Sequence, residues 1–319
     1  MHTNYIPPKR KTKVVFVQLG SPEAPTPKAL RKYLRNFLGD PRVIDIPAWK
    51  WKIILNCFVL PFRPAKSAKL YERIWDGKSF PLITNTENFT NSVRDELKKI
   101  DPEGYVEVNH AFLLSPPYVN EVYDSWEEDL KNNVGATKLM VIPMFPQYSE
   151  STIASGVDAL AKELSQRVKI PTFEVITNFH RTHAFIDNSV TQLDAKVEEL
   201  NKQGIEIDKL VISFHGMQKR RVVFKGDDYY RHCYETYRLI VDRLKRLRPE
   251  QTVMTFQSRF GREEWITPYT EKVVEDLIGE GHKQLMIYSP SFVADCLETT
   301  DELGHELAEE AKEWGGNVY

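Results

Sequence analysis

Short apolar runs and amphipathic segments alternate along most of the chain. Residues 14–19 form a largely β-branched apolar run that predicts a strand, and residues 27–38 carry apolar side chains at the spacing of a helix. The same order of strand and helix recurs, with further strands predicted at 106–114, 138–142, 173–177, 210–214, 252–257 and 284–288. Repeated β–α units are typical of parallel sheets with helices on both faces, so the predicted fold class is α/β.

A chain of 319 residues is longer than one core usually serves, so two domains of similar size are expected. We place the boundary in the proline-containing loop after the third predicted strand, which gives an N-terminal domain of residues 1–143 and a C-terminal domain of residues 144–319. A short likeness between residues 139–142 and 285–288 supports two related halves. The last helix, residues 296–314, is expected to pack back near the junction of the domains.

Residues 48–62 depart from this pattern because they form a nearly unbroken apolar run with two tryptophans. The run is too short to span a bilayer, which takes about 20 residues. One interpretation is a helix buried between the domains. The other is an apolar lip that holds a flat apolar ligand or touches a membrane surface, where Trp and Lys are favoured.

The composition excludes several classes of protein. A content of 41% hydrophobic and 28% charged residues, with a formal net charge of -2, is ordinary for a soluble protein and gives no case for binding nucleic acid. The three cysteines, Cys57, Cys233 and Cys296, form no CxxC pair, so neither a disulfide framework nor a zinc site is expected. The first 13 residues lack the apolar run of a signal peptide, so we expect a cytoplasmic protein.

His215 is the first candidate for chemistry. It follows the apolar run 210–214 and precedes Gly216, and the carboxyl ends of parallel strands present side chains to ligands. Imidazole is the side chain whose proton moves near neutral pH. The alternative is a histidine that only forms a hydrogen bond with a neighbouring loop.

A row of acidic residues follows another predicted strand end. Residues 285–288 lead into Asp295, Glu298 and Glu302, whose spacings of three and four place them on one face of a helix. The row continues with His305, Glu306 and Glu309. Asp295 and Glu298 alone would also fit a capping box at a helix start. Because a capping box does not account for the longer row, we interpret the row as a ladder of proton or cation acceptors.

Two further clusters combine polar or cationic side chains with aromatic ones. Residues 256–265 follow a strand and include Ser258 and Trp265. Arg63, Lys66 and Tyr71 follow the apolar segment. Ordinary surface charge is the alternative for both clusters. Together with His215 and the acidic row, they predict a large apolar slot with cations at its rim, suited to an amphiphilic aromatic ligand that bears carboxylates.

Several motifs in order resemble one family over nearly the whole chain. They are Leu19-Gly20-Ser21-Pro22, Pro146-Gln147-Tyr148-Ser149, Ser213-Phe214-His215-Gly216, Gly226-Asp227-Asp228-Tyr229, residues 256–262 and residues 294–299. With these motifs the chain resembles the ferrochelatases, which insert ferrous iron into a porphyrin at the end of haem synthesis. The resemblance implies two Rossmann-like, chelatase-type domains, each a parallel sheet flanked by helices, that enclose a porphyrin cleft.

The resemblance also implies roles for single residues. His215 would be the site histidine and Glu298 its partner acid, both meeting the reacting metal, and Asp295 and Glu302 would lie on a path for protons or metal. Leu19 would face the macrocycle. The other implied cleft residues are Trp265 beside the porphyrin, Arg63, Lys66 and Ser258 at the propionates, and Tyr71 and His183.

The chain departs from the family pattern at several positions. Ser291 and Val293 stand where a glycine and a serine are usual, and Leu113-Leu114 replaces an arginine and a tyrosine, which removes one expected polar contact. No cysteine follows Cys296, whereas the cysteines that bind an iron–sulfur cluster in some members lie beyond this point. We therefore expect no cluster and no permanently bound cofactor.

The predicted function is insertion of ferrous iron into protoporphyrin IX to form protohaem, by a monomer with peripheral contact to the inner membrane. Leu19, which stands before the first glycine in place of a tyrosine, favours protoporphyrin as the substrate. The alternatives are a coproporphyrin or cobalt chelatase of the same fold, and a porphyrin or haem carrier without catalysis. His215 and Glu298 argue against the carrier, because a carrier needs neither a base nor a proton path.

Overall fold

The computed structural model describes residues 11–131, 136–168, 170–261 and 263–319. They form two compact units. Unit 1 consists of the described residues as far as Met144 together with Glu150–Thr177, and unit 2 consists of Phe145–Ser149 and Asn178–Tyr319. The chain therefore passes three times from one unit to the other, after residues 144, 149 and 177.

This division differs from a single boundary at residue 143, because residues 150–177 return to unit 1. Strand β4 (Thr172–Val175) pairs in parallel with β3 (Ala136–Pro143) of that unit. A parallel neighbour needs a crossover connection, which helix α6 (Ser155–Ser165) provides. The pairing partner of β4 decides its unit, and the local sequence does not specify that partner.

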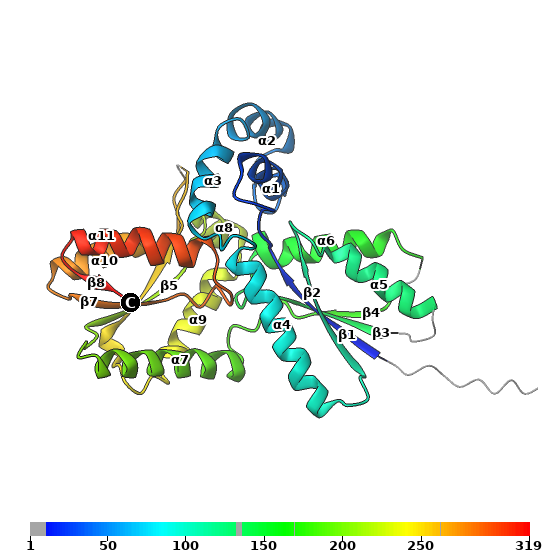
Figure 1. Ribbon diagram of the computed structural model, residues 1–319. Helices are drawn as coiled ribbons and strands as arrows, with labels where there is room; N and C mark the ends of the chain where they lie inside the picture. The colour runs from blue at the N-terminus through cyan, green and yellow to red at the C-terminus, as the bar shows by residue number, and fades with distance from the viewer. Residues whose placement is uncertain (1–10, 132–135, 169, 262) are drawn as a thin grey trace, which may run out of the picture. The chain divides into compact units, whose positions relative to one another are not determined.

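Unit 1 is built on a parallel sheet with the strand order β2-β1-β3-β4. Strands β1 (Lys11–Gln18) and β2 (Val106–Phe112) pair over seven residues, from Thr12 opposite Val106 to Gln18 opposite Phe112. Val15 and Val17 of β1 pack in one cluster with side chains of α5 (Val119–Lys131) and α6. Phe16 packs instead against Phe89 of α4 (Pro81–Ile100). Successive side chains of a strand point to opposite faces, so both faces of this sheet carry helices (Figure 1).

Unit 2 repeats the architecture with the strand order β6-β5-β7-β8, again parallel. Its strands are β5 (Lys209–His215), β6 (Thr252–Gln257), β7 (Gln284–Tyr288) and β8 (Asn317–Val318). The α/β class with two parallel sheets flanked by helices is therefore confirmed. Strand β8 was not predicted, because two residues carry no readable alternation of apolar and polar positions.

The two faces of the β5 strand pack under different helices. Leu210, Ile212 and Phe214 belong to a cluster with α7 (His183–Lys202) and α9 (Tyr229–Val241). Val211 belongs to a cluster with α10 (Thr270–Gly279) and the last helices of the chain. Figure 1 shows these two sets of helices on opposite sides of the sheet. By the alternation of a strand, His215 points to the Val211 side.

The remaining helical segments connect the strands. In unit 1 they are α1 (Pro27–Gly39), α2 (Ala48–Ile54), the π-helix η1 (Leu55–Val59), α3 (Arg63–Arg73) and the π-helix η2 (Glu150–Ala154). In unit 2 they are α8 (Lys219–Lys225), the 3-10 turn η3 (Pro249–Gln251), the π-helix η4 (Glu298–Leu307) and α11 (Ala308–Glu313).

The geometry predicted for the acidic row is corrected by η4. This segment is a π-helix, in which hydrogen bonds join residues five apart, so side chains four or five apart share a face. Glu298 and Glu302 keep a common face, whereas Asp295 lies before the helix and accepts a hydrogen bond from the Thr299 hydroxyl at 3.0 Å. Leu303 and Leu307 anchor the helix on the sheet of its own unit.

The interpretation of residues 48–62 as a buried helix is wrong for one side of this segment. Leu55 and Leu60 pack against α1, and the Trp51 indole donates a hydrogen bond to the Leu38 carbonyl at 2.6 Å. The other side, continued by Phe62 just after η1, is solvent-exposed, and we call it the apolar face of α2–η1. Its large side chains are Trp49 (66% exposed), Ile53 (55%), Phe58 (66%) and Phe62 (72%).

Candidate active site

The end of β5 is held close to β6, and this closeness requires a glycine after His215. A Cβ at Gly216 would lie 2.6 Å from the Gln257 carbonyl oxygen and 2.9 Å from the Trp265 ring. The Gly216 N–H donates to the same Gln257 carbonyl at 2.7 Å. The chain can therefore turn away from the sheet here only without a side chain, and His215 is the last residue of the strand that can reach a ligand.

The proton on the His215 ring is assigned by a single contact. Nδ1 lies 2.6 Å from the Gly216 carbonyl oxygen, and a carbonyl can only accept a hydrogen bond. The neutral ring therefore carries its proton on Nδ1, and Nε2 keeps a lone pair for a proton or a metal ion. Trp265 and Phe292 flank the ring, with centroid distances of 6.5 and 6.1 Å.

Ser258 and Glu302 form a two-point contact beside this histidine. The Ser258 N–H donates to Oε1 of Glu302 at 2.7 Å, and the Ser258 hydroxyl donates to Oε2 at 2.6 Å. Ser258 has a φ of 63°, a left-handed conformation that is uncommon for residues other than glycine. The Ser258 hydroxyl, which was expected to bind a propionate, thus binds the carboxylate of Glu302 in the acidic row.

The electrostatics of Glu302 show which groups gather around it. Burial raises the pKa of Glu302 above its ordinary value, and the neighbouring charge of Glu298 raises it further. The two hydrogen bonds from Ser258 and the proximity of His215 lower the same pKa. The structure therefore brings together four of the predicted site residues: His215, Ser258, Glu298 and Glu302.

Gln257, a member of the motif 256–262, connects the parts of this site, although no role was predicted for it. Its amide donates to the Glu298 carbonyl at 3.0 Å, and its Oε1 accepts from the hydroxyls of Ser213 at 2.7 Å and Ser289 at 3.2 Å. These contacts join β5, β6, the loop after β7 and the first turn of η4. The available signals were the polar side chain at the buried end of β6 and its place in the motif 256–262.

Three other predicted residues of unit 2 have different surroundings. Trp265 is 2% exposed and packs against Phe260 at a centroid distance of 4.9 Å, so the described part of the chain encloses most of its ring. Asp295 is exposed and joins no cluster with Glu302. His183 is the exposed first residue of α7.

The predicted residues of unit 1 lie around α3 and the end of β1. Leu19 follows β1, and the carbonyl of the next residue, Gly20, accepts a hydrogen bond from the Tyr33 hydroxyl at 3.3 Å. Tyr71 packs edge-on against Tyr33 at 6.1 Å and lies within electrostatic reach of Arg63. Lys66 is exposed one turn beyond Arg63 on the same helix. Leu113 and Leu114, where the family pattern has polar side chains, are partly buried against the unit's apolar clusters.

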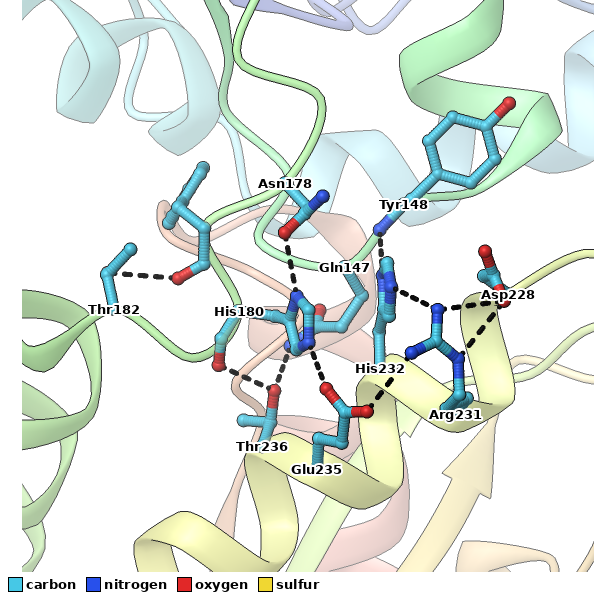
Figure 2. Close-up of polar contacts among 11 residues, drawn as sticks. Gln147, Tyr148, Asn178, His180, Thr182, Asp228, Arg231, His232, Glu235 and Thr236 are labelled. Carbon is cyan, nitrogen blue, oxygen red and sulfur yellow. Dashed lines mark hydrogen bonds and ion pairs between the residues drawn. The ribbon is translucent and has the colours of Figure 1, made fainter.

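A second polar cluster in unit 2, absent from the sequence-based predictions, surrounds two stacked histidines (Figure 2). The rings of His180 and His232 are nearly parallel, with centroids 3.9 Å apart, and both side chains are buried. His180 Nε2 lies 2.7 Å from a Glu235 oxygen, and His232 Nδ1 accepts the Tyr148 N–H at 3.1 Å. Because it accepts a hydrogen bond, Nδ1 of His232 carries no proton.

This histidine cluster holds residues 145–149, the short segment of unit 2 between two passages of the chain. The Gln147 amide donates to the Thr236 hydroxyl at 3.1 Å, next to the bond from Tyr148 to His232 (Figure 2). Burial lowers the pKa of His232 to about 4, and the charge of His180 contributes. Burial also lowers the pKa of His180, although its bond with Glu235 acts in the opposite direction.

The described residues contain no group of three or more His, Cys, Asp and Glu side chains arranged to hold a metal ion. Among the helices of the same residues, none has the length and apolarity needed to cross a bilayer. Cys57 is exposed, Cys233 and Cys296 are buried, and all three are free thiols.

Comparison with known proteins adds the following similarities. A family described as Ferrochelatase matches residues 11–319. The protein named Ferrochelatase from Idiomarina loihiensis is 39% identical over 309 residues, which are 97% of this chain and 82% of that protein. The Ferrochelatase of Marinobacter nauticus is 37% identical over 306 residues, 96% of this chain and 80% of that one. The Ferrochelatase of Actinobacillus pleuropneumoniae serotype 7 is 38% identical over 309 residues, 97% and 91% of the two chains.

Among solved structures, SirB from Bacillus subtilis with Fe3+ is similar in fold. The TM-score is 0.50 at 13% sequence identity, and the similarity covers 97% of this chain and 86% of that chain. At this level of identity the likeness supports the fold alone.

Proposed function

Since the chain belongs to the ferrochelatase family and is a chelatase that inserts ferrous iron into protoporphyrin IX, we propose that His215, Glu298 and Glu302 carry out the insertion. The observation that supports this most is the proton-free Nε2 of His215, which lies on the sheet face covered by η4. A base and two carboxylates are thereby gathered at one strand end.

The proposed chemistry follows from the proton balance of the reaction. One ferrous ion replaces two pyrrole protons of the porphyrin, so two protons have to leave as the metal–nitrogen bonds form. His215 can accept one of them at Nε2, because Nδ1 already donates to the Gly216 carbonyl. Glu302 is suited to the next transfer, because burial raises its pKa towards the working pH and its charge can stabilise the imidazolium.

The remaining site residues keep the roles that we propose from the resemblance. Arg63 and Lys66 of α3 are the proposed partners of the propionates, since guanidinium and ammonium groups bind carboxylates. Ser258 has its hydroxyl bound to Glu302 and would have to exchange this partner to reach a propionate. Leu19, Tyr71 and Trp265 are the proposed apolar contacts, of which Trp265 is only 2% exposed and would have to be uncovered to touch the porphyrin. A monomer without a permanently bound cofactor stays a prediction.

The test is metal insertion followed through the porphyrin absorption spectrum under anaerobic conditions, with ferrous iron and protoporphyrin IX. His215→Ala is expected to lower the rate by at least about 100-fold, the usual contribution of a general base. His282→Ala is the matched control, because this histidine lies in a loop of unit 2 between α10 and β7. A wild-type rate for His215→Ala would contradict the assignment, and a parallel reaction with coproporphyrin III tests the choice of porphyrin.

We further propose that the apolar face of α2–η1 binds the membrane surface. Four large apolar side chains are exposed there, and Lys50 and Lys52 lie on α2, which carries the first two of them. Apolar side chains flanked by lysine suit an interface that combines acyl chains with anionic headgroups. Such contact would let an amphiphilic porphyrin pass between membrane and enzyme without crossing water.

Sedimentation with vesicles of phosphatidylcholine and phosphatidylglycerol tests this proposal. The wild-type protein is expected to sediment with the vesicles, and the double variant Trp49→Ser with Phe62→Ser is expected to stay largely in solution. Ile100→Ser is the control, because Ile100 is also exposed in unit 1, at 79%, but lies at the end of α4. Equal loss of binding in the control and the double variant would count against the apolar face.

A further inference from the structure

Tyr229, the first residue of α9, has a buried hydroxyl with partners from different parts of unit 2, in addition to the Cys233 thiol on its own helix. The side chain is 6% exposed. Its hydroxyl lies 2.9 Å from the main-chain oxygen of His215 and 3.1 Å from the Ser291 hydroxyl. The side chain of Asp227 accepts the Tyr229 N–H at 2.9 Å, which fixes the start of the helix.

The direction of these hydrogen bonds can be assigned. The carbonyl of His215 can only accept, so the Tyr229 hydroxyl donates its one proton there. The Ser291 hydroxyl is then the donor to Tyr229. Burial raises the pKa of Tyr229 well above its ordinary value, so the hydroxyl keeps its proton and the arrangement persists across the working pH range.

Two of these partners, His215 and Ser291, belong to the segments that carry the proposed catalytic groups. His215 ends β5, and Ser291 lies in the loop that leads from β7 to Glu298 at the start of η4. Phe292, the neighbour of Ser291, packs on the His215 ring at 6.1 Å. A shift of the Ser291 loop would therefore displace His215 in two ways, through the hydrogen bonds of Tyr229 and through the packing of Phe292.

We propose that Tyr229 is a positioning residue that joins the His215 main chain to the Ser291 loop and so sets the distance between His215 and Glu298. The proposal rests on the catalytic role proposed above for His215 and Glu298. Tyr229 itself is not proposed to touch iron or porphyrin. Loss of its hydroxyl is expected to change the rate of metal insertion. A small displacement of the reacting groups lowers this rate strongly but hardly changes the affinity for the porphyrin.

The experiment compares kcat for ferrous iron insertion and KM for the porphyrin in two matched tyrosine variants. Tyr229→Phe removes only the hydroxyl and is expected to lower kcat about tenfold with little change in KM. Tyr237→Phe removes a hydroxyl from the same helix that contacts the Thr252 hydroxyl at 2.9 Å, and is expected to keep the wild-type kcat. Thermal unfolding of both variants establishes that the folded fractions are equal at the assay temperature.

Ser291→Ala supplies the second arm, since it removes the donor and leaves Tyr229 in place. It is expected to lower kcat about two- to threefold, and to have no further effect when combined with Tyr229→Phe, because coupled groups are not additive. A wild-type kcat for Tyr229→Phe, a change confined to KM, or full additivity of the two substitutions would overturn the proposal. If Tyr229→Phe does not fold, Ser291→Ala decides, and a wild-type kcat for it is the contradicting result.

His215→Ala separates this inference from the proposed function. If His215→Ala inserts iron at the wild-type rate, the assignment of the catalytic residues is wrong, and the role of Tyr229 is lost with it. If His215→Ala is inactive while Tyr229→Phe has the wild-type kcat, the catalytic assignment stands and only the positioning role is refuted.

Discussion

His215 acquires its reactive form through the carbonyl of the glycine that follows it. Gly216 brings this carbonyl to Nδ1 because its missing Cβ lets the chain pass between the Gln257 carbonyl and the Trp265 ring. The pair His215-Gly216 at a strand end could be read from the sequence. The requirement for a glycine at position 216 could not be read from the sequence. The atoms that exclude a side chain there belong to Gln257 of β6 and to Trp265 in the loop after β6.

Gly216→Ala is expected to destabilise unit 2 and to slow metal insertion. The new Cβ would lie 2.6 Å from a backbone oxygen, which cannot move without displacing β6, and overpacking of this kind costs about 1–3 kcal/mol. Urea unfolding gives the stability and the porphyrin assay gives the rate. Gly279→Ala, at a helix end where a Cβ would meet nothing within 4 Å, should lower neither the stability nor the rate. Equal stability of the two variants would contradict the expectation.

Helix η4 illustrates how far a pattern defines an element. The row of acids predicted a helix after residue 295, and a helix is present, but as a π-helix. The spacing of apolar residues does not distinguish the two forms, because Leu303 and Leu307 share a face in either. Contacts from β6 hold the first turn, from the Gln257 amide to the Glu298 carbonyl and from Ser258 to Glu302. Local sequence therefore determined the element, and a neighbouring strand determined its geometry.

Leu307→Ala is expected to lower the free energy of unfolding of unit 2 by about 2–5 kcal/mol, the range for truncating a buried leucine. Leu307 is 4% exposed and anchors η4 on the sheet, so the carboxylates of the helix should also lose their fixed position. Metal insertion measured well below the unfolding temperature should fall as well. Lys312→Ala, on the exposed side of α11, is the control. If Leu307→Ala has the same urea midpoint of unfolding as the wild type, Leu307 does not anchor the helix.

At the scale of the whole molecule, the chain passes three times between two units, and the stacked histidines secure one of the connecting segments. The pair was not predicted because His180 and His232 come from different elements and neither stands in a recognisable pattern. The charged groups around the pair are Glu235, which accepts from His180, and Arg231, Asp228 and Arg181, which contribute smaller effects.

Stability should depend on pH through these histidines. His232 has a pKa of about 4 in the folded protein, against 6.5 for a free histidine. Above the free value the ring is neutral in both states, and its contribution is constant. As the pH falls from 6.5 towards 4, only the unfolded chain binds the proton, so stability decreases by at most about 1.4 kcal/mol per pH unit for this group. His180, whose pKa is also lowered, acts in the same direction.

Urea unfolding at a series of pH values between about 5 and 8 measures this dependence. His232→Gln cannot take up the proton and is expected to show a smaller loss of stability on acidification than the wild type. His282→Gln, outside the cluster, should keep the wild-type dependence. An unchanged pH dependence in His232→Gln would mean that the buried pair is not the group that titrates.

The sequence by itself predicted the α/β class and seven of the described strands, and it placed His215 at a strand end and Glu298 and Glu302 on one helix face. Strands, helices and motifs consist of short stretches of neighbouring residues, so a local pattern can predict them. Only the tertiary structure decided the proton on His215, the engagement of Ser258 by Glu302, the stacking of His180 on His232 and the return of residues 150–177 to unit 1. Each of these depends on distances and burial set by how the chain packs. A local pattern of apolar and polar positions does not contain that information.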